Sequence, residues 1–197
     1  LTNITNTKLL CCNGDSTTSS TVTPGTITAN GDPTVSASTP FSKVFNVIGG
    51  TSEDPTFKTG FATDFITSRP ADSSSSWWTY SRLTGTEYVA LDSNGAEGAG
   101  GASKRLDFMN GFATGASTSD TAWGWKRHAG FDMVTYKGDG ASGLQIPHSC
   151  NKIPEMIWVK NRTDTQNWAV GHKGLNGGTD PWKYVGFLNS SVVPIFD

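Results

Sequence analysis

Only a few residues of this 197-residue chain have types and spacings that suit metal chemistry. His148 and Cys150 are two positions apart, so on a strand both would share one face, and His172 or the adjacent Cys11 and Cys12 could join them. A closed zinc site takes four ligands, usually from two short-spaced pairs, and this chain offers one loose pair. We therefore expect a surface histidine beside a core thiol, with no metal and no cofactor.

Two glycine-rich runs resemble phosphate-binding loops. Gly138–Gly143 matches G-x-G-x-x-G, but a dinucleotide site needs a helix after it, and the following residues 144–148 are strand-like and contain Pro147. The run Gly95–Gly101 lacks the Gly-Lys-Ser/Thr ending of a nucleotide-binding loop. We expect a hairpin loop at 138–143 and a flexible or tightly turned loop at 95–101.

Acidic residues are numerous, yet the sequence selects no catalytic pair. Glycoside cleavage needs two carboxylates that flank one bond. Asp64, Glu87, Asp92 and Glu155 lie at the ends of predicted strands and could line a groove. There is also no Gly-x-Ser-x-Gly motif for a nucleophilic serine. The sequence therefore predicts no catalytic residue, and we expect a protein that is not an enzyme.

Aromatic residues are the better candidates for ligand binding. Rings beside Asn, Asp and Thr suit sugar recognition, because they stack on the apolar faces of sugar rings. The candidates are Trp77, Trp78, Tyr80, Trp168, Trp182 and Tyr184. Packing inside the fold is the more frequent role of any one such ring. Adjacent Trp77 and Trp78 must face opposite sides of a strand, whereas Trp123 and Trp125 share a side and are expected in the core.

The elements that would position these residues are short strands. Runs of four to seven β-branched or aromatic residues, bounded by Gly, Asn, Asp and Pro, occupy 45–48, 64–67, 77–80, 87–91, 121–126, 131–136, 155–160, 168–170 and 182–188. Only 104–112 has apolar residues at helical spacing, and Gly111 would end that helix. The pattern predicts an all-β chain of β-sandwich or jelly-roll-like modules with an extended N-terminal segment.

Composition narrows the class of protein. Ser and Thr number 47, charged residues make up only 16%, and the formal net charge is −2. With no basic excess and no apolar run of about 18 residues, we expect neither nucleic-acid binding nor membrane insertion. Residues 13–40 carry two charges and no aromatic ring, so they predict an extended linker. We expect a strand within 1–12, that linker, a first module at 41–137 and a second, incomplete module at 138–197.

An internal repeat of about 90 residues supports the two modules. Phe45–Ile48 corresponds to Phe131–Val134, and Asp64–Ile66 corresponds to Glu155–Ile157. Further counterparts are Trp77 and Trp168, Arg82 and Lys173, and the runs 88–93 and 184–190, the last with one insertion. A period of this length is that of a domain rather than of a solenoid. The second copy has no counterpart of Trp123–Lys126 before Asp197, so we expect it to lack the end of its unit.

Several motifs resemble structural proteins of marine tailed bacteriophages, cyanophages especially. The resemblance covers Leu1–Cys12, where Thr7–Cys12 (TKLLCC) would close a laminin-G-like β-sandwich, and the repeated body. In the body the matching motifs are W-x-W-K-R from Trp123, F-D-x-V-x-Y-x-G-x-G from Phe131, residues 146–148, and P-E-M-I-x-V-K-N-R from Pro154. No catalytic residue is carried over by this resemblance.

The resemblance implies a virion protein of the tail-fibre, appendage or capsid-decoration type, made in the host cytoplasm and displayed on the outside of the particle. Its expected partners are other virion proteins, further copies of itself in a homo-oligomer, and a glycan or receptor on the host surface. Two alternatives stay open: a carbohydrate-active enzyme that degrades polysaccharide on the same appendage, and a bacterial surface adhesin.

Overall fold

The computed structural model describes residues 43–115, 118–128, 130–192 and 195–196, all within one unit of the chain, residues 40–197. The predicted N-terminal strand and linker lie outside this range. The described residues form antiparallel strands and short 3₁₀ turns at Leu175–Gly178 and Pro181–Lys183, with no α-helix among them. The all-β prediction is confirmed. None of the helical segments described is long and apolar enough to span a membrane.

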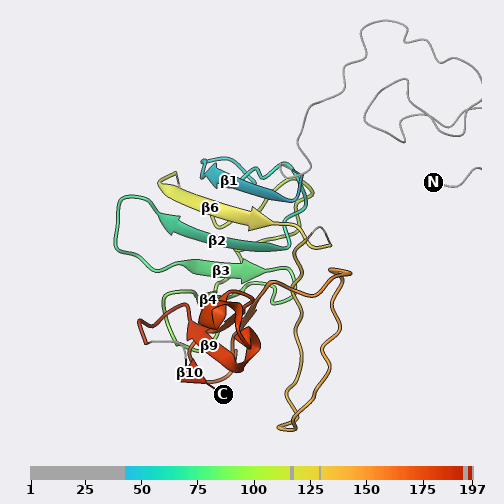
Figure 1. Cartoon of the computed structure of the whole chain (residues 1–197). Coiled ribbons are helices and arrows are strands. Elements are labelled where there is room, and N and C mark those ends of the chain that lie inside the picture. The colour runs from blue at the N-terminus through green and yellow to red at the C-terminus, as the bar shows by residue number, and fades with distance from the viewer. Residues whose placement is uncertain (1–42, 116–117, 129, 193–194, 197) are drawn as a thin grey trace, which may run out of the picture. The chain divides into compact units, whose positions relative to one another are not determined.

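Six strands form the larger sheet (Figure 1). They are β1 (Phe45–Gly49), β2 (Phe65–Pro70), β3 (Trp78–Ser81), β4 (Glu87–Ala90), β5 (Gly98–Ala99) and β6 (Asp120–Trp125). Their order is β1-β6-β2-β3-β4-β5, so β2 to β5 follow the chain order while β6 returns to lie between β1 and β2. The last strand of this region in the sequence therefore lies between the first two.

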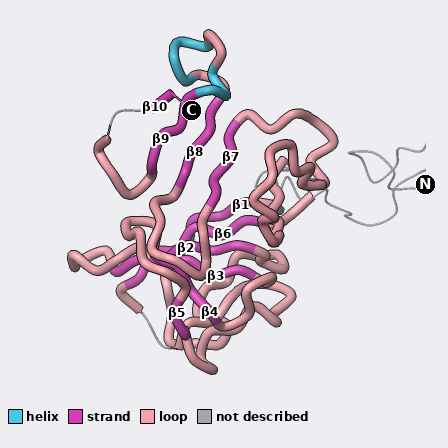
Figure 2. Tube along the Cα trace, turned by 90° about the horizontal axis from the view of Figure 1, so that it is seen from below, coloured by secondary structure: helices cyan, strands magenta, loops and turns pink. Residues whose placement is uncertain are grey.

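The smaller sheet has four strands (Figure 2). They are β7 (Met156–Val159), β8 (Ala169–His172), β9 (Tyr184–Phe187) and β10 (Ile195–Phe196), in the order β10-β9-β8-β7. Strand β7 is thus an edge strand, paired only with β8 among the described residues.

The hydrophobic core lies on one face of the larger sheet, here called the core face. Ile66, Tyr80 and Ala122 point from the sheet into this core, where they meet Phe57 and Phe112. Those two phenylalanines belong to a second layer of irregular chain, residues 50–63 and 101–115. Their backbones bond to each other in both directions, at N–O distances of 2.9 and 3.0 Å. The second layer is therefore held by isolated bridges rather than by a continuous ladder.

Three sequence expectations are wrong. Residues 104–112 are not helical, because Arg105 pairs with Ala113 and Phe112 with Phe57, so the chain between Arg105 and Ala113 forms a loop that turns back on itself. Residues 131–136 form no strand. Trp123 and Trp125 do share a face, but it is the face opposite the core, called here the outer face, and both are only half-buried.

The side of β6 that faces the core carries small residues for a steric reason. A Cβ atom added to Gly124 would lie 2.9 Å from Thr59 Cγ2 and 3.3 Å from Thr63 Cγ2. The second layer packs directly on the backbone of β6, so the large rings of this strand can only be on its outer face.

One pair of hairpins agrees with the internal repeat in its strand pairing. Ile66 pairs with Tyr80, and Ile157, 91 positions later, pairs with Gly171, which is 91 positions after Tyr80. The hairpins β2–β3 and β7–β8 therefore have the same register. We call residues 45–125 the first repeat and residues 131–192 the second repeat.

Equivalent hydrogen bonds recur in both repeats. Asp92 Oδ1 accepts the backbone N–H of Trp77 at 3.1 Å, and Asn189 Oδ1 accepts that of Trp168 at 2.9 Å. The backbone N–H of Arg82 donates to the carbonyl of Asp64 at 2.8 Å, and that of Lys173 donates to the carbonyl of Glu155 at 2.9 Å. Each of these basic side chains also forms an ion pair with that acid.

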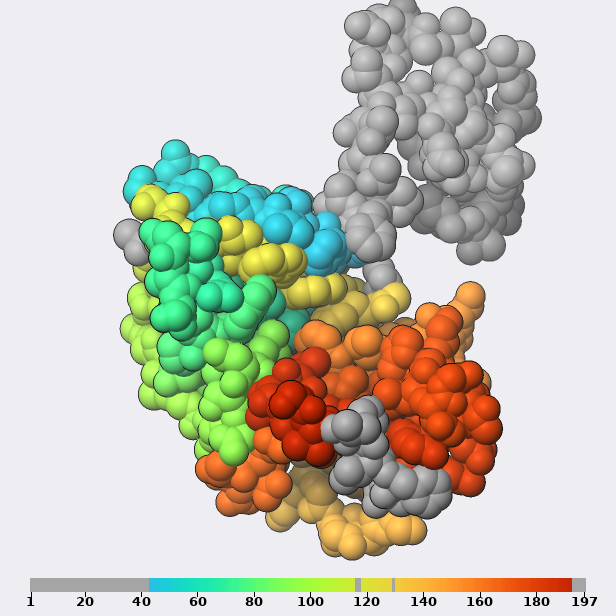
Figure 3. All heavy atoms as spheres, turned by 60° about the vertical axis from the view of Figure 1, so that its left-hand side comes forward, coloured from blue at the N-terminus to red at the C-terminus, as the bar shows by residue number. Residues whose placement is uncertain are grey.

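The two repeats lie against each other (Figure 3). The ring of Phe131 lies 5.5 Å from that of Phe65 and 6.0 Å from that of Trp125, and a small set of polar bonds adds to this contact. The indole N–H of Trp168 donates to the carbonyl of Ala90 at 2.8 Å. Arg162 forms a two-point ion pair with Glu97, at 2.9 and 2.7 Å, and their backbones are also hydrogen-bonded. These bonds link the loop after β7 to the chain between β4 and β5.

Candidate functional site

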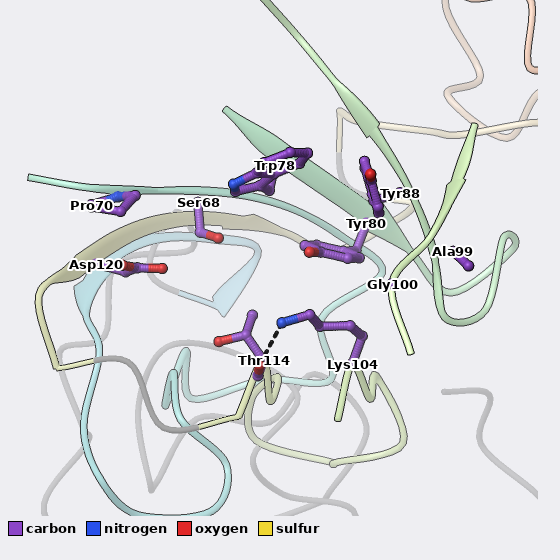
Figure 4. Close-up of a pocket in the computed structure, with 10 residues that line it drawn as sticks. All are labelled: Ser68, Pro70, Trp78, Tyr80, Tyr88, Ala99, Gly100, Lys104, Thr114 and Asp120. Carbon is purple, nitrogen blue, oxygen red and sulfur yellow. Dashed lines mark hydrogen bonds between the residues drawn. The ribbon is translucent and has the colours of Figure 1, made fainter. Parts of the chain in front are cut away.

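A pocket of about 470 Å³ lies between the core face of the larger sheet and the second layer (Figure 4). Its volume is in the range usual for small-molecule sites. We call it the aromatic pocket. Its lining consists of Ser68, Pro70, Trp78, Tyr80, Tyr88, Ala99, Gly100, Lys104, Thr114 and Asp120.

Three rings form one wall of the aromatic pocket. Trp78 and Tyr80 are two positions apart on β3 and so share its core face, while Tyr88 pairs with Tyr80 from β4. The ring centroids of Trp78 and Tyr88 are 4.7 Å apart with the planes at 87°, and those of Tyr80 and Tyr88 are 6.2 Å apart. Tyr80 is nearly buried, whereas Trp78 and Tyr88 are half-buried and present ring surface to the pocket.

Polar groups face this wall from the other side. Lys104 Nζ donates to the carbonyl of Thr114 at 2.6 Å and lies 5.8 Å from the centroid of the Tyr80 ring. Burial lowers the pKa of Lys104, and the nearby Asp120 carboxylate opposes this effect. Burial, followed by the charges of Tyr88 and Asp120, raises the pKa of Tyr80 to about 12, so Tyr80 is a neutral hydroxyl donor at neutral pH.

Glycines let the backbone pass close to the rings. A Cβ on Gly98 would lie 2.8 Å from the Tyr88 ring, and one on Gly100 would lie 2.1 Å from the carbonyl oxygen of Thr86. The run 95–101 is therefore not simply a loop, because it contains β5 and forms the rim of the pocket. Glycine is required there by the close approach of the chain.

The six ring residues selected from sequence do not form one site. Trp78 and Tyr80 come together in the aromatic pocket, while Trp77 lies on the outer face against Trp123. The other three belong to the second repeat. Trp168 is 6% exposed with its indole N–H bonded, Trp182 is exposed beside Gly171, and Tyr184 begins β9.

Trp77 does line a smaller pocket of about 340 Å³ on the outer face. Trp123 forms another wall of this pocket, and the guanidinium carbon of Arg69 lies 5.5 Å from the centre of the Trp77 ring. Arg69 Nη2 donates to the carbonyl of Ser73 at 2.8 Å, while its buried Nε has no partner among the described residues. This outer pocket is cationic and mostly apolar.

A serine, a histidine and an aspartate meet at the start of the second repeat. Ser149 Oγ lies 2.6 Å from His128 Nδ1 and 2.9 Å from Asp132 Oδ2. In a catalytic triad the aspartate orients the histidine, but here both groups contact the serine itself. Asp132 also accepts bonds from Arg127 Nε and from the backbone N–H groups of Met133 and Ser149. We interpret this cluster as a structural link that joins residues 127–133 to residue 149.

Hydrogen bonding controls the charge of Asp132. Burial alone would raise the pKa of this carboxyl, but bonds from Arg127, from the backbone and hydroxyl of Ser149, and from Met133 hold it well below its usual range. Asp132 is therefore an anion at neutral pH, and its side chain is 5% exposed.

The remaining sequence candidates are separated in the described part of the chain. No group of three or more His, Cys, Asp or Glu side chains there is placed to hold a metal. Cys150 is a free, half-buried thiol, while Cys11 and Cys12 lie outside the described residues. Residues 138–143 form a loop with Gly140 and Gly143 at positive φ, and no helix follows them.

Sequence reasoning missed most of the pocket. The pairing of Tyr88 with Tyr80 follows from a β3–β4 hairpin, and the turn at Thr84-Gly85 was a usable signal for it. Lys104 and Asp120 had no such signal. They reach the pocket because the second layer folds back on the sheet and because β6 returns between β1 and β2.

The described chain is thus an antiparallel all-β protein that contains a repeat and an aromatic pocket. A family model described as a domain of unknown function, DUF7483, matches residues 115–192, which is less than half of the chain. The matched range includes β6 and β7–β9, so it covers the end of the first repeat and the whole of the second. No curated protein and no solved structure gives a significant match.

Proposed function

We propose that this chain is a non-enzymatic attachment protein on the outside of a phage particle, and that its aromatic pocket binds a sugar of the host surface. The observation that carries this proposal is the pairing of a three-ring wall with hydrogen-bonding groups across one pocket. Sugars have apolar ring faces that stack on Trp and Tyr, and hydroxyls that need donors and acceptors.

Each polar group has a role in this proposal. The Asp120 carboxylate would accept hydrogen bonds from two neighbouring hydroxyls, and the Lys104 ammonium, which has donors beyond its bond to Thr114, would donate to a ring or hydroxyl oxygen. A neutral hexose with adjacent hydroxyls fits this set. Asp120 is the one carboxylate in the lining, whereas glycoside cleavage uses two, and this favours binding over cleavage.

Weak binding at each pocket is sufficient for attachment by a particle. Several tethered copies raise the effective concentration of the pocket at the host surface, so overall avidity exceeds single-site affinity by orders of magnitude. The resemblance of the repeated motifs to structural proteins of marine phages supports the virion setting. Immunogold labelling of intact particles tests that setting, and particles without label would contradict it.

Saturation-transfer NMR with a panel of neutral hexoses at millimolar concentration tests the pocket directly. We expect Asp120→Asn and Trp78→Ala each to weaken binding at least tenfold. Trp77→Ala is the matched control, because Trp77 is an equally half-buried ring on the opposite face. Equal loss in Trp77→Ala, or no binding by the unmodified chain, would contradict sugar binding. Release of reducing ends from host polysaccharide would instead support the enzymatic alternative.

A further inference from the structure

Among the described residues, no strand covers the free edge of β7, whereas its counterpart in the first repeat has a strand there. Strand β2 is paired with β3 on one side and with β6 on the other. Its counterpart β7 is paired with β8 in the same register, and no described strand pairs with its other side (Figure 2). The position that β6 occupies in the first repeat is therefore open in the second.

The exposure of β7 agrees with this open edge. In the first repeat Phe65, Ile66 and Thr67 of β2 are 8%, 0% and 4% exposed. At the equivalent positions of β7, Met156, Ile157 and Trp158 are 51%, 42% and 39% exposed. A run of apolar residues on an edge strand is a template for pairing with another chain.

The counterpart of β1 in the second repeat also has no strand partner among the described residues. In the first repeat β6 pairs with β1 as well as with β2. Residues 131–134 are the counterpart of β1, and they are in no strand. Both neighbours of one strand position are therefore unpaired in the second repeat.

The acid at the end of the open edge is placed for charge complementarity. In the first repeat Asp64 Oδ2 accepts the backbone N–H of Arg127, at the basic end of β6, at 2.9 Å. Glu155 is the counterpart of Asp64, and its side chain is 70% exposed. An incoming strand with a basic end would thus meet a carboxylate at the place where the first repeat has one.

We propose that the edge of β7 is a docking site for one antiparallel strand of β6-like sequence. Such a strand has small residues alternating with tryptophan and a basic end, as in Thr121–Arg127. By the register of the first repeat, its glycine lies opposite Ile157 and its first tryptophan opposite Trp158. This is strand addition, in which the main chain supplies affinity and alternate side chains supply specificity. The inference does not depend on sugar binding.

The direction of the backbone groups gives a sharp test. Lys173 N–H bonds to the carbonyl of Glu155, so the odd-numbered residues of β7 face β8 and the N–H of Trp158 faces the open edge. Trp158→Pro removes that donor without removing a bond to β8. Trp158→Thr is the matched control, because it keeps the donor and copies Thr67 of the first repeat.

The probe is a fluorescein-labelled peptide of residues 119–127, titrated into the full chain and followed by anisotropy. We expect saturable binding that weakens at least tenfold in Trp158→Pro and less than threefold in Trp158→Thr. Circular dichroism checks that both variants fold. Should Trp158→Pro not fold, a peptide N-methylated at Trp123 leaves the protein unchanged. The Lys126 N–H bonds to the Val44 carbonyl, so the Trp123 N–H faces β2, and its methylation should weaken binding tenfold as well.

Three outcomes would overturn the proposal. The first is no binding of the 119–127 peptide, and the second is equal binding of the unmodified and N-methylated peptides. The third is self-association of the chain, seen by sedimentation and abolished by Trp158→Pro, without peptide binding. That result would assign the β7 edge to pairing between two copies.

Discussion

Strands β2 and β7 are the same element of one repeat in two different surroundings. Both begin after an acid that pairs with the basic residue directly after the next strand, and both have the same register with that strand. Yet Ile66 is fully buried and Ile157 is 42% exposed. The local pattern therefore determines the hairpin, while burial depends on what packs on it: β6 on the edge, and the layer of residues 50–63 and 101–115 on the face.

The largest expected difference between the repeats concerns these two isoleucines. Ile66→Ala removes a side chain from the closed core and should lower the free energy of unfolding by about 2–5 kcal/mol. Ile157→Ala, at the equivalent exposed position, should change it by about 0.5 kcal/mol or less. Urea denaturation followed by tryptophan fluorescence measures both. A comparable loss of unfolding free energy in the two variants would mean that β7 is buried in solution, which would contradict the difference in burial between β2 and β7.

Asn46 and its counterpart Asp132 each bond to a distant loop residue, but the two side chains differ in charge. In the first repeat the amide of Asn46 donates to the carbonyl of Thr59 at 3.1 Å. In the second repeat the counterpart of Asn46 is Asp132, which accepts two bonds from Ser149. The first link is neutral and the second depends on an anion, so acid should affect only the second.

Asp132→Asn tests this difference through pH. The folded-state pKa of Asp132 lies below its unfolded value of about 3.9, so its contribution to stability is complete above that value and is lost as pH falls below it. At pH 7 the variant should be about 1–3 kcal/mol less stable, since a nearly buried carboxylate loses charged hydrogen bonds. The difference in free energy of unfolding between the variant and the unmodified protein, measured by urea titration, should shrink from pH 5 to pH 2. A stability difference that does not change with pH would contradict a stabilising role for the Asp132 anion.

The sequence contains enough to predict most strands but not their partners. Eight of the nine predicted runs contain a strand, because alternation and turn residues are local signals. The ninth, 131–136, begins with an apolar pattern like that of β1, but no described β6-like strand lies beside it to pair with. Strand pairing over long distances along the chain is the information that local patterns lack.

The same limit applies to the core and the pocket. Ser and Thr are polar residues that are mostly exposed in proteins, yet Thr56, Thr59 and Thr63 are buried and hydrogen-bonded within the second layer. Trp78 and Tyr80 could be selected as ring residues on one face of a strand. Asp120 reaches the pocket only through the return of β6, and no local spacing indicates that.

Two glycines in strands, Gly124 and Gly171, test how tightly each repeat's sheet is covered, and the expected effects are the smallest of those considered. Gly124→Ala places a Cβ against Thr59 and Thr63, which are both buried and cannot move aside, so it should cost about 1–3 kcal/mol by overpacking. Gly171→Ala places a Cβ 3.2 Å from the ring of Trp182. That ring is 46% exposed and can turn toward solvent, so the cost should be below about 1 kcal/mol.

Thermal unfolding of Gly124→Ala and Gly171→Ala, each measured against the unmodified chain, gives both values. Both substitutions add the same methyl group to a strand, and the intrinsic preference for alanine over glycine is the same for each. The difference between the two therefore reports packing alone. Equal costs would show that the sheet of the second repeat is covered as tightly as that of the first. A larger loss of stability for Gly124→Ala would show that the second layer packs more tightly on β6 than Trp182 packs on β8.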